Sequence, residues 1–126
     1  MIDHLDHIVL TTRDKARCIA FYVDLLDVQL ETFAEGRIAF KFGSQKINLH
    51  ESGKEFSPKA QYPMPGSLDL CFIASVPLDV IIAKLHAFPW PIEEGPVMRT
   101  GAVSKLRSIY LRDPDQNLIE ISEQVS

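Results

Sequence analysis

Hydrophobic and polar positions follow first a strand period and then a helix period, and this pattern occurs twice along the chain. Residues 5–11 are rich in branched side chains and too few for a helix, which predicts a strand covered on both faces. Residues 13–26 carry apolar side chains at helical spacing, with Thr12 or Asp14 available as the cap, which predicts an amphipathic helix lying on a sheet. Three more strand-like runs follow, at residues 28–33, 37–42 and 46–50. Together these elements predict a β-α-β-β-β module.

A second module is predicted after a break in the pattern. Residues 51–66 hold three prolines and two glycines and are typical of a linker. Residues 68–74 then predict a strand, and residues 77–88 predict a helix with Ser75 as its cap and Pro77 in its first turn. Three more strands are predicted, at residues 92–94, 104–111 and 118–122. A turn at residues 95–96 follows the first of them, and a turn at residues 113–117 separates the other two.

The two halves can be aligned as an internal repeat. His7 aligns with Asp69 at an offset of 69 − 7 = 62, and Asn48 aligns with Glu120 at an offset of 120 − 48 = 72. The difference fits an insertion around residues 95–103. We therefore expect one domain over residues 1–126, with module 1 at about residues 4–52, a linker at 53–66 and module 2 at about 67–125.

Composition and charge narrow the class of protein. The 126 residues are 46% hydrophobic and carry a net charge of 13 − 17 = −4, values that suit one soluble domain with a core of its own. The positive charges are scattered, and no apolar run approaches the roughly 20 residues of a membrane span. We therefore expect no nucleic acid or membrane partner and a cytoplasmic location. Cys18 and Cys71 stand alone in apolar surroundings and are expected to be small buried hydrophobes.

Polar side chains interrupt the predicted strands at five positions, which are His7, Asn48, His50, Asp69 and Glu120. A charged or imidazole group within a buried strand is costly unless it is paired, hydrogen-bonded or bound to a metal. In the repeat, His7 is equivalent to Asp69 and Asn48 is equivalent to Glu120. Because strand side chains alternate, His50 lies on the same face as Asn48. Imidazole and carboxylate suit Mn, Fe, Ni or Zn. The alternatives are hydrogen-bonded core residues, an exposed strand end at His50, a cation partner for Asp69 and a turn brace at Asn48.

Arg99 and Thr100 lie in a stretch flanked by glycines. An arginine in such a loop could clamp an anionic substrate through paired hydrogen bonds, so both residues are candidates for substrate binding. The alternative is an ordinary surface arginine.

The chain resembles the vicinal oxygen chelate superfamily, which includes glyoxalase I, bleomycin-resistance proteins and extradiol dioxygenases. The resemblance rests on LDHIVLTTRD, FYVDLLDVQL, INLHE and YLRDPDQNLIEIS, and it spans essentially the whole chain. Within the superfamily the chain is similar to small bacterial virulence-associated glyoxalase-domain proteins, through KINLHE and GPVMRTGA. The resemblance implies an α+β fold in which two tandem βαβββ modules form a curled open-barrel sheet with a central cleft. It also implies a divalent metal in that cleft, formed within one chain or across a homodimer.

The resemblance places the family's first-strand histidine on His7 and its final-strand glutamate on Glu120. Asp69 and Asn48 stand where many relatives have a histidine and a glutamate, so both depart from the family pattern. The implied ligand set is His7, His50 and Glu120, with Asp69 and Asn48 as further possible ligands or catalytic groups.

Two functional hypotheses follow from the resemblance. The first is a divalent-metal enzyme, a lyase or isomerase, thiol transferase or dioxygenase, that acts on a small oxygenated substrate. The second is a metal-free protein that binds a drug or metabolite, as bleomycin-resistance proteins do. His7 and Glu120 favour the enzyme, whereas Asn48 and Asp69 keep the binding protein in consideration.

Overall fold

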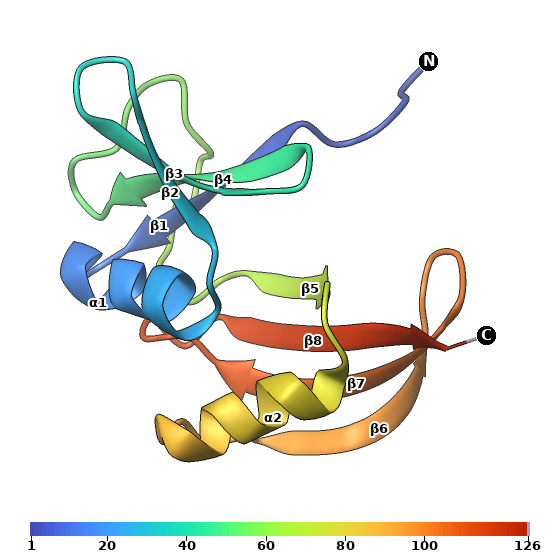
Figure 1. The fold of residues 1–126 in the computed structure, drawn as a ribbon. Coiled ribbons are helices and arrows are strands. Elements are labelled where there is room, and N and C mark those ends of the chain that lie inside the picture. Colours follow the sequence, from blue (N-terminus) through green and yellow to red (C-terminus); the bar gives the residue numbers. More distant parts are fainter. Residues whose placement is uncertain (126) are drawn as a thin grey trace. The chain divides into compact units, whose positions relative to one another are not determined.

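The computed structural model describes residues 1–125. The chain forms two compact units, residues 1–67 and residues 68 onward, which are called module 1 and module 2 below (Figure 1). No helix among the described residues is long and apolar enough to cross a membrane.

Module 1 contains one helical segment and one four-stranded sheet. Its elements are β1 (His7–Thr12), α1 (Lys15–Ile19), η1 (Ala20–Leu25), β2 (Gln29–Phe33), β3 (Arg37–Phe42) and β4 (Gln45–Glu51). The strand order is β1-β4-β3-β2, with β1 parallel to β4 and the other neighbours antiparallel. The predicted β-α-β-β-β order is therefore confirmed for this half of the chain.

The helical segment covers one face of the module 1 sheet. Asp14 is its cap, because its side chain accepts a hydrogen bond from the Arg17 N–H at 3.1 Å. The predicted helix is continuous, but its second half, η1, is a π-helical turn. The Tyr22 ring stacks on Phe40 of β3 with centroids 4.9 Å apart, and both side chains are fully buried. The apolar core of module 1 thus lies on the Phe40 face of the sheet.

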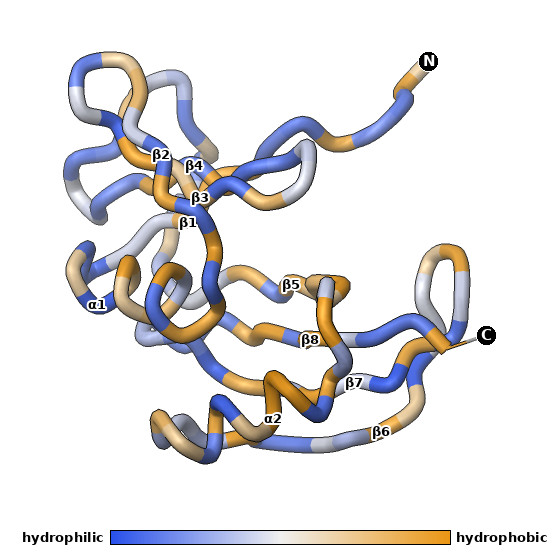
Figure 2. Tube along the Cα trace, in the orientation of Figure 1, coloured by the Kyte–Doolittle hydropathy of each residue, from blue (hydrophilic) through white to orange (hydrophobic). Residues whose placement is uncertain are grey.

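Module 2 repeats this topology. Its elements are β5 (Asp69–Ile73), α2 (Leu78–Ala87), β6 (Glu94–Thr100), β7 (Lys105–Arg112) and β8 (Leu118–Val125). The strand order is β5-β8-β7-β6, with β5 parallel to β8. Figure 2 shows hydrophobic and hydrophilic positions alternating along β8. This alternation follows from one strand face packing on an apolar core while the other carries polar groups.

The cap predicted at Ser75 is wrong. Pro77 occupies the N-cap position and offers no side-chain hydrogen bond, so the first turn of α2 needs another acceptor. Glu123 of β8 supplies it, because its Oε2 accepts from the Leu78 N–H at 3.1 Å. The cap comes from 45 residues away along the chain, which local sequence could not indicate.

The turn predicted at residues 95–96 is also wrong. These residues lie within β6, where the pairing with β7 shifts register between Glu94 and Val97. Gly95 has φ of +109°, a conformation that suits glycine, and it allows the strand to continue through an irregularity. Arg99 and Thr100 therefore belong to a strand and not to the glycine-flanked loop that the sequence suggests.

The strand registers agree with the proposed repeat. Val9 pairs with Asn48 in module 1, and Cys71 pairs with Glu120 in module 2. These pairs are related by offsets of 71 − 9 = 62 and 120 − 48 = 72, the same two offsets that align the halves of the sequence.

Two burial expectations differ from the structure. Cys18 is fully buried as expected, but Cys71 is exposed, and Val9 is 41% exposed although both faces of its strand were expected to be covered. Cys71 and Val9 are exposed because their strands, β5 and β1, each lie at an edge of a four-stranded sheet.

Candidate functional site

The module 1 sheet face opposite Phe40 carries polar side chains in three rows. In the order β1, β4, β3 and β2, these rows are His7, Lys46, Lys41 and Gln29; Val9, Asn48, Ala39 and Glu31; and Thr11, His50, Arg37 and Phe33. Residues paired across neighbouring strands project to the same side of a sheet. His7, Asn48 and His50, all predicted from sequence, therefore share one face.

His7 is held by its neighbour in sequence. The Asp6 Oδ2 lies 2.7 Å from the His7 Nδ1, and the His7 side chain is 44% exposed. This hydrogen bond favours the tautomer with the proton on Nδ1 and leaves the lone pair on Nε2. A histidine that ligates a metal commonly donates its other ring N–H to a carboxylate in this way.

Asn48 and His50 lie deeper on the same face. They are 7% and 3% exposed, and the Asn48 Oδ1 and His50 Nδ1 are buried without a hydrogen-bond partner among the described residues. The Arg37 guanidinium lies 3.4 Å from the His50 Nε2. Burial, and then the charge of Arg37, lower the pKa of His50, so its ring is neutral at pH 7.

The strand register separates His7 from His50. His7 pairs with Lys46 and Thr11 pairs with His50, so the two histidines are four positions apart along the strands. At a rise of about 3.3 Å per residue this is roughly 13 Å. Asn48 lies halfway between them. A single cation is therefore reached more readily by His7 together with Asn48 than by both imidazoles.

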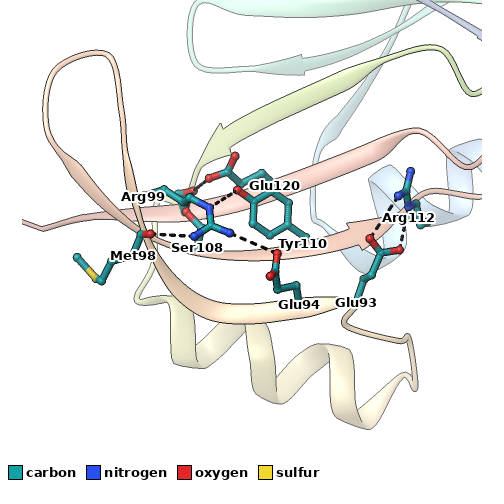
Figure 3. A network of polar contacts seen from close by, with 9 residues as sticks. Glu93, Glu94, Met98, Arg99, Ser108, Tyr110, Arg112 and Glu120 are labelled. Carbon is teal, nitrogen blue, oxygen red and sulfur yellow. Dashed lines mark hydrogen bonds and ion pairs between the residues drawn. The ribbon is translucent and has the colours of Figure 1, made fainter.

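The corresponding face of module 2 carries Glu120. Cys71, Glu120, Tyr110 and Glu94 form a row across β5, β8, β7 and β6, the row equivalent to that of Asn48 in module 1. Figure 3 shows Glu120, Tyr110 and Arg99 pointing toward one another from three strands. Asp69 lies two residues before Cys71, on the same side of β5, and is exposed.

One buried serine, Ser122, contacts the carboxylate of Glu120, and a second, Ser108, contacts Ser122. The Ser122 hydroxyl donates to the Glu120 Oε2 at 3.3 Å, and the hydroxyl oxygens of Ser108 and Ser122 are 2.6 Å apart. The Cys71 Sγ lies 3.4 Å from the Ser122 Oγ. Cys71 as a residue is exposed, but its thiol is partly desolvated, and this desolvation and the nearby charge of Glu120 raise the pKa of Cys71, although the Ser122 hydrogen bond opposes the shift. The thiol is therefore protonated at pH 7.

Arg99 lies on the same sheet face and is held there by three hydrogen bonds. Its Nε donates to the Tyr110 hydroxyl at 2.9 Å, one terminal nitrogen donates to the Met98 carbonyl at 3.0 Å, and the other lies 3.3 Å from the Glu94 Oε2 (Figure 3). The hydrogen bond to Tyr110 is the largest cause that raises the pKa of Arg99, and the charges of Glu94 and Glu120 add to it. Thr100 follows Arg99 in the strand and projects from the opposite face, so the structure does not bring the two candidates together.

The predicted metal ligands divide between the modules, with His7 and His50 in module 1 and Glu120 in module 2. Within residues 1–125, no three His, Cys, Asp or Glu side chains are gathered in a way that could hold a metal ion. The donors nevertheless suit a divalent cation, because His7 keeps a free lone pair and Asn48 presents a buried, unpaired oxygen.

Sequence reasoning missed several polar residues on these faces, namely Glu31, Arg37, Ser108, Tyr110 and Ser122. None of them stands out in its own strand. The signal that would have found them is the cross-strand register. Arg37 and Tyr110 lie opposite His50 and Glu120, and Ser122 follows Glu120 by two residues. Glu31 and Ser108 are one pairing further away, through Ala39 and Ser122.

Comparison with known proteins gives relatives over the whole chain. The chain is 50% identical, over 99% of its length and 87% of the relative's, to "Virulence protein STM3117" of Salmonella typhimurium. The crystal structure of that protein matches with a TM-score of 0.96 over 99% of each chain. An integron cassette protein from the mobile metagenome of V. Cholerae is 49% identical, with a TM-score of 0.94 over 98% of this chain and 96% of the other.

A fungal relative and a more distant structure extend the comparison. The chain is 51% identical over 94% of its length to "Glyoxalase domain-containing protein RDO1" of Mycosarcoma maydis, and it spans 66% of that protein. Lactoylglutathione lyase from Agrobacterium tumefaciens shares the fold, with 23% identity and a TM-score of 0.74 over 98% of this chain and 95% of the other. A family model, "Glyoxalase/Bleomycin resistance protein/Dioxygenase superfamily", matches residues 4–121. The α+β fold of two βαβββ modules and the predicted resemblance are thus confirmed, and the chain belongs to the glyoxalase/bleomycin resistance protein/dioxygenase superfamily.

Proposed function

We propose that the protein is a divalent-metal-dependent enzyme that acts on a small oxygenated substrate, with His7 and Glu120 as metal ligands. One observation carries the proposal: each module has a sheet face that carries polar side chains. In module 1 this face carries His7 and Asn48, and in module 2 Glu120 occupies the position equivalent to Asn48. When bound, the metal would hold oxygens of the substrate and stabilise negative charge that develops on them.

The third ligand is a choice between His50 and Asn48. His50 remains the ligand implied by the family resemblance, but the Arg37 guanidinium lies against its Nε2 and opposes a second positive charge there. Asn48 is closer to His7 in register and offers an unpaired Oδ1. Supported by these contacts, we propose Asn48 as the third ligand and a hydrogen-bonding role for His50.

The remaining polar residues of module 2 supply binding and orientation. Ser122 orients the Glu120 carboxylate, and Arg99, held by Tyr110 and Glu94, presents positive charge to an anionic part of a substrate. Asp69 lies on the same side of its sheet as Glu120 and is exposed, so it is our candidate for a general base.

Metal analysis of the purified protein tests the proposal. We expect wild-type protein, loaded with Mn²⁺, Fe²⁺, Ni²⁺ or Zn²⁺ in separate samples and then desalted, to retain about one ion per chain with at least one of them. His7→Ala and Glu120→Ala should lose that ion, whereas His4→Ala, a change at an exposed histidine, should retain it. Asn48→Ala and His50→Ala then decide the third ligand. A wild-type protein that retains none of the four ions would refute the proposal.

A second candidate function is a metal-free binding protein for a small molecule. The observation that favours it is that Asn48 and Asp69 replace the glutamate and histidine that the family resemblance leads us to expect. In that case the wild type would hold no metal and would still bind an aromatic or glycopeptide ligand. We also propose that the protein is a homodimer, as members of this superfamily often are, and light scattering on the eluted protein would show a mass of two chains.

A further inference from the structure

Module 1 buries three side-chain atoms that have no hydrogen-bond partner among the described residues. They are the Glu31 Oε2, the Asn48 Oδ1 and the His50 Nδ1. Most buried polar atoms in proteins are paired, so three unpaired atoms on one sheet face require an explanation. Glu31 and Asn48 flank the buried Ala39 in the middle row of that face, and His50 lies in the next row.

The equivalent row of module 2 shows what these atoms lack. There Tyr110 takes the place of Ala39, and Glu94 takes the place of Glu31. Glu94 accepts from Arg99, and Arg99 donates in turn to the Tyr110 hydroxyl. In module 1 a methyl group stands in place of the phenol, so hydrogen bonds that module 2 makes internally are left for another molecule.

The unpaired atoms define the hydrogen bonds that such a molecule must make. The Glu31 and Asn48 oxygens need donors, and the Asn48 oxygen has two lone pairs, so it can accept from a hydroxyl group and also face a metal. The Arg37 guanidinium donates to the His50 Nε2, so the proton of the neutral ring is on Nδ1 and needs an acceptor. A pair of hydroxyl groups can donate twice and accept once.

Charge around His50 argues against an ionic ligand for Glu31 and His50. The Arg37 guanidinium lies 3.4 Å from the His50 Nε2 and disfavours a cation there. A carboxylate would bring acceptor oxygens against the oxygens of Glu31 and Asn48. Phe56 borders the cluster, since its ring lies 5.4 Å from the His50 ring and 4.2 Å from the Arg37 guanidinium carbon, and it is 44% exposed. It offers an apolar surface to the carbon atoms of a ligand.

We propose that Glu31, Asn48 and His50 bind neighbouring hydroxyl groups of a neutral, polyhydroxylated small molecule. The inference deepens the proposed function, because His7 lies on the same sheet face and the bound molecule would be the substrate or part of it. The binding itself needs no metal, so it can be tested separately.

The test is a titration of full-length, ¹⁵N- and ¹³C-labelled protein in EDTA with xylitol, followed by NMR. We expect saturable shifts of the Asn48 and His50 side-chain signals, and weaker or no shifts with acetate and methylguanidinium. Glu31→Ala and Asn48→Ala should each weaken xylitol binding by about tenfold, the usual scale for a lost hydrogen bond to a buried group. The matched control is Glu35→Ala in the exposed β2–β3 turn, which should bind as the wild type does.

Three results would overturn the inference. The first is the absence of a saturable response to xylitol, which is expected if the three atoms bind only internal water. The others are tighter binding of acetate than of xylitol, and equal xylitol affinity in Glu31→Ala and Glu35→Ala. If Glu31→Ala does not fold, Glu31→Met replaces it and should still lose affinity, because its side chain is of similar length and has no acceptor oxygen. His7→Ala and Glu120→Ala should bind xylitol normally in EDTA, so loss of metal binding and loss of polyol binding are distinguishable.

Discussion

At the residue scale, two buried asparagines show how much the pairing of an amide matters. Asn117 donates to the Asp113 Oδ2 at 2.8 Å and accepts from the Leu68 N–H at 2.9 Å, whereas the Asn48 Oδ1 has no partner among the described residues. Both side chains are more than nine-tenths buried. An unpaired buried polar group costs free energy that an apolar group of similar size does not.

We therefore expect opposite results when each is replaced by leucine. Asn48→Leu should leave the free energy of unfolding unchanged or raise it by about 1 kcal/mol, and Asn117→Leu should lower it by about 2 to 4 kcal/mol. Urea denaturation of both variants measures the difference. A loss for Asn48→Leu as large as that for Asn117→Leu would show that Asn48 has a structural hydrogen bond.

The thiol of Cys71 reports on the charge of Glu120. Burial and the Glu120 carboxylate raise the pKa of Cys71, so less thiolate is present at a given pH and alkylation should be slower than for an ordinary cysteine. In a Cys18→Ser background, we expect the pH profile of iodoacetamide labelling to shift above the usual thiol range. Glu120→Gln should move it back toward lower pH because the repulsion is removed. An unchanged profile would contradict this coupling.

The residues that the sequence identified share one property. His7, Asn48 and Glu120 are each a polar interruption of a strand that was expected to be apolar, and the family resemblance then favoured His7 and Glu120 as ligands. Tyr110 and Glu31 could not be found this way, because a tyrosine or a glutamate in a half-exposed strand is ordinary. Their relevance depends on which residue lies opposite in the neighbouring strand, and single-strand patterns do not contain that information.

At the scale of elements, β6 shows where local sequence signals failed. A Gly-Pro pair usually marks a turn, yet here the strand continues through it with a shift in register. The pairing with β7 outweighs the local preference. In contrast, β3 has the bounds predicted from sequence, because glycine-containing turns flank an uninterrupted strand pattern.

Glycine substitutions test whether this irregularity is required. A Cβ on Gly95 would lie 2.5 Å from the Ser108 carbonyl oxygen and 3.0 Å from the Ile109 Cα, while one on Gly36 would meet nothing within 4 Å, and both glycines have positive φ. Gly95→Ala should therefore cost about 3 kcal/mol or more of unfolding free energy, and Gly36→Ala about 1 to 2 kcal/mol. Equal melting temperatures for the two variants would contradict the close approach at Gly95.

At the scale of the whole molecule, the repeat distributes one set of donors over two compact units. His7 is in module 1 and Glu120 is in module 2, and each lies on the polar face of its own sheet. The sequence predicted this division because the repeat was visible in it. His7 and Glu120 are 113 positions apart along the chain (120 − 7 = 113). The sequence could not predict how far the two residues depend on each other in metal binding, because they share no strand and would be linked only by a common metal ion.

A double-mutant cycle on metal affinity measures that interaction. If His7 and Glu120 bind the same ion, removing either one loses most of the affinity, and removing the second adds less than its own single effect. Titration of wild-type protein, His7→Ala, Glu120→Ala and the double variant with the retained metal should therefore show losses that are far from additive. The modules would bind metal independently if the wild-type chain held two ions, each single variant lost one of them, and the losses added in the double variant. The His4→Ala control should keep the affinity of the wild type, because its exposed imidazole lies before the first strand.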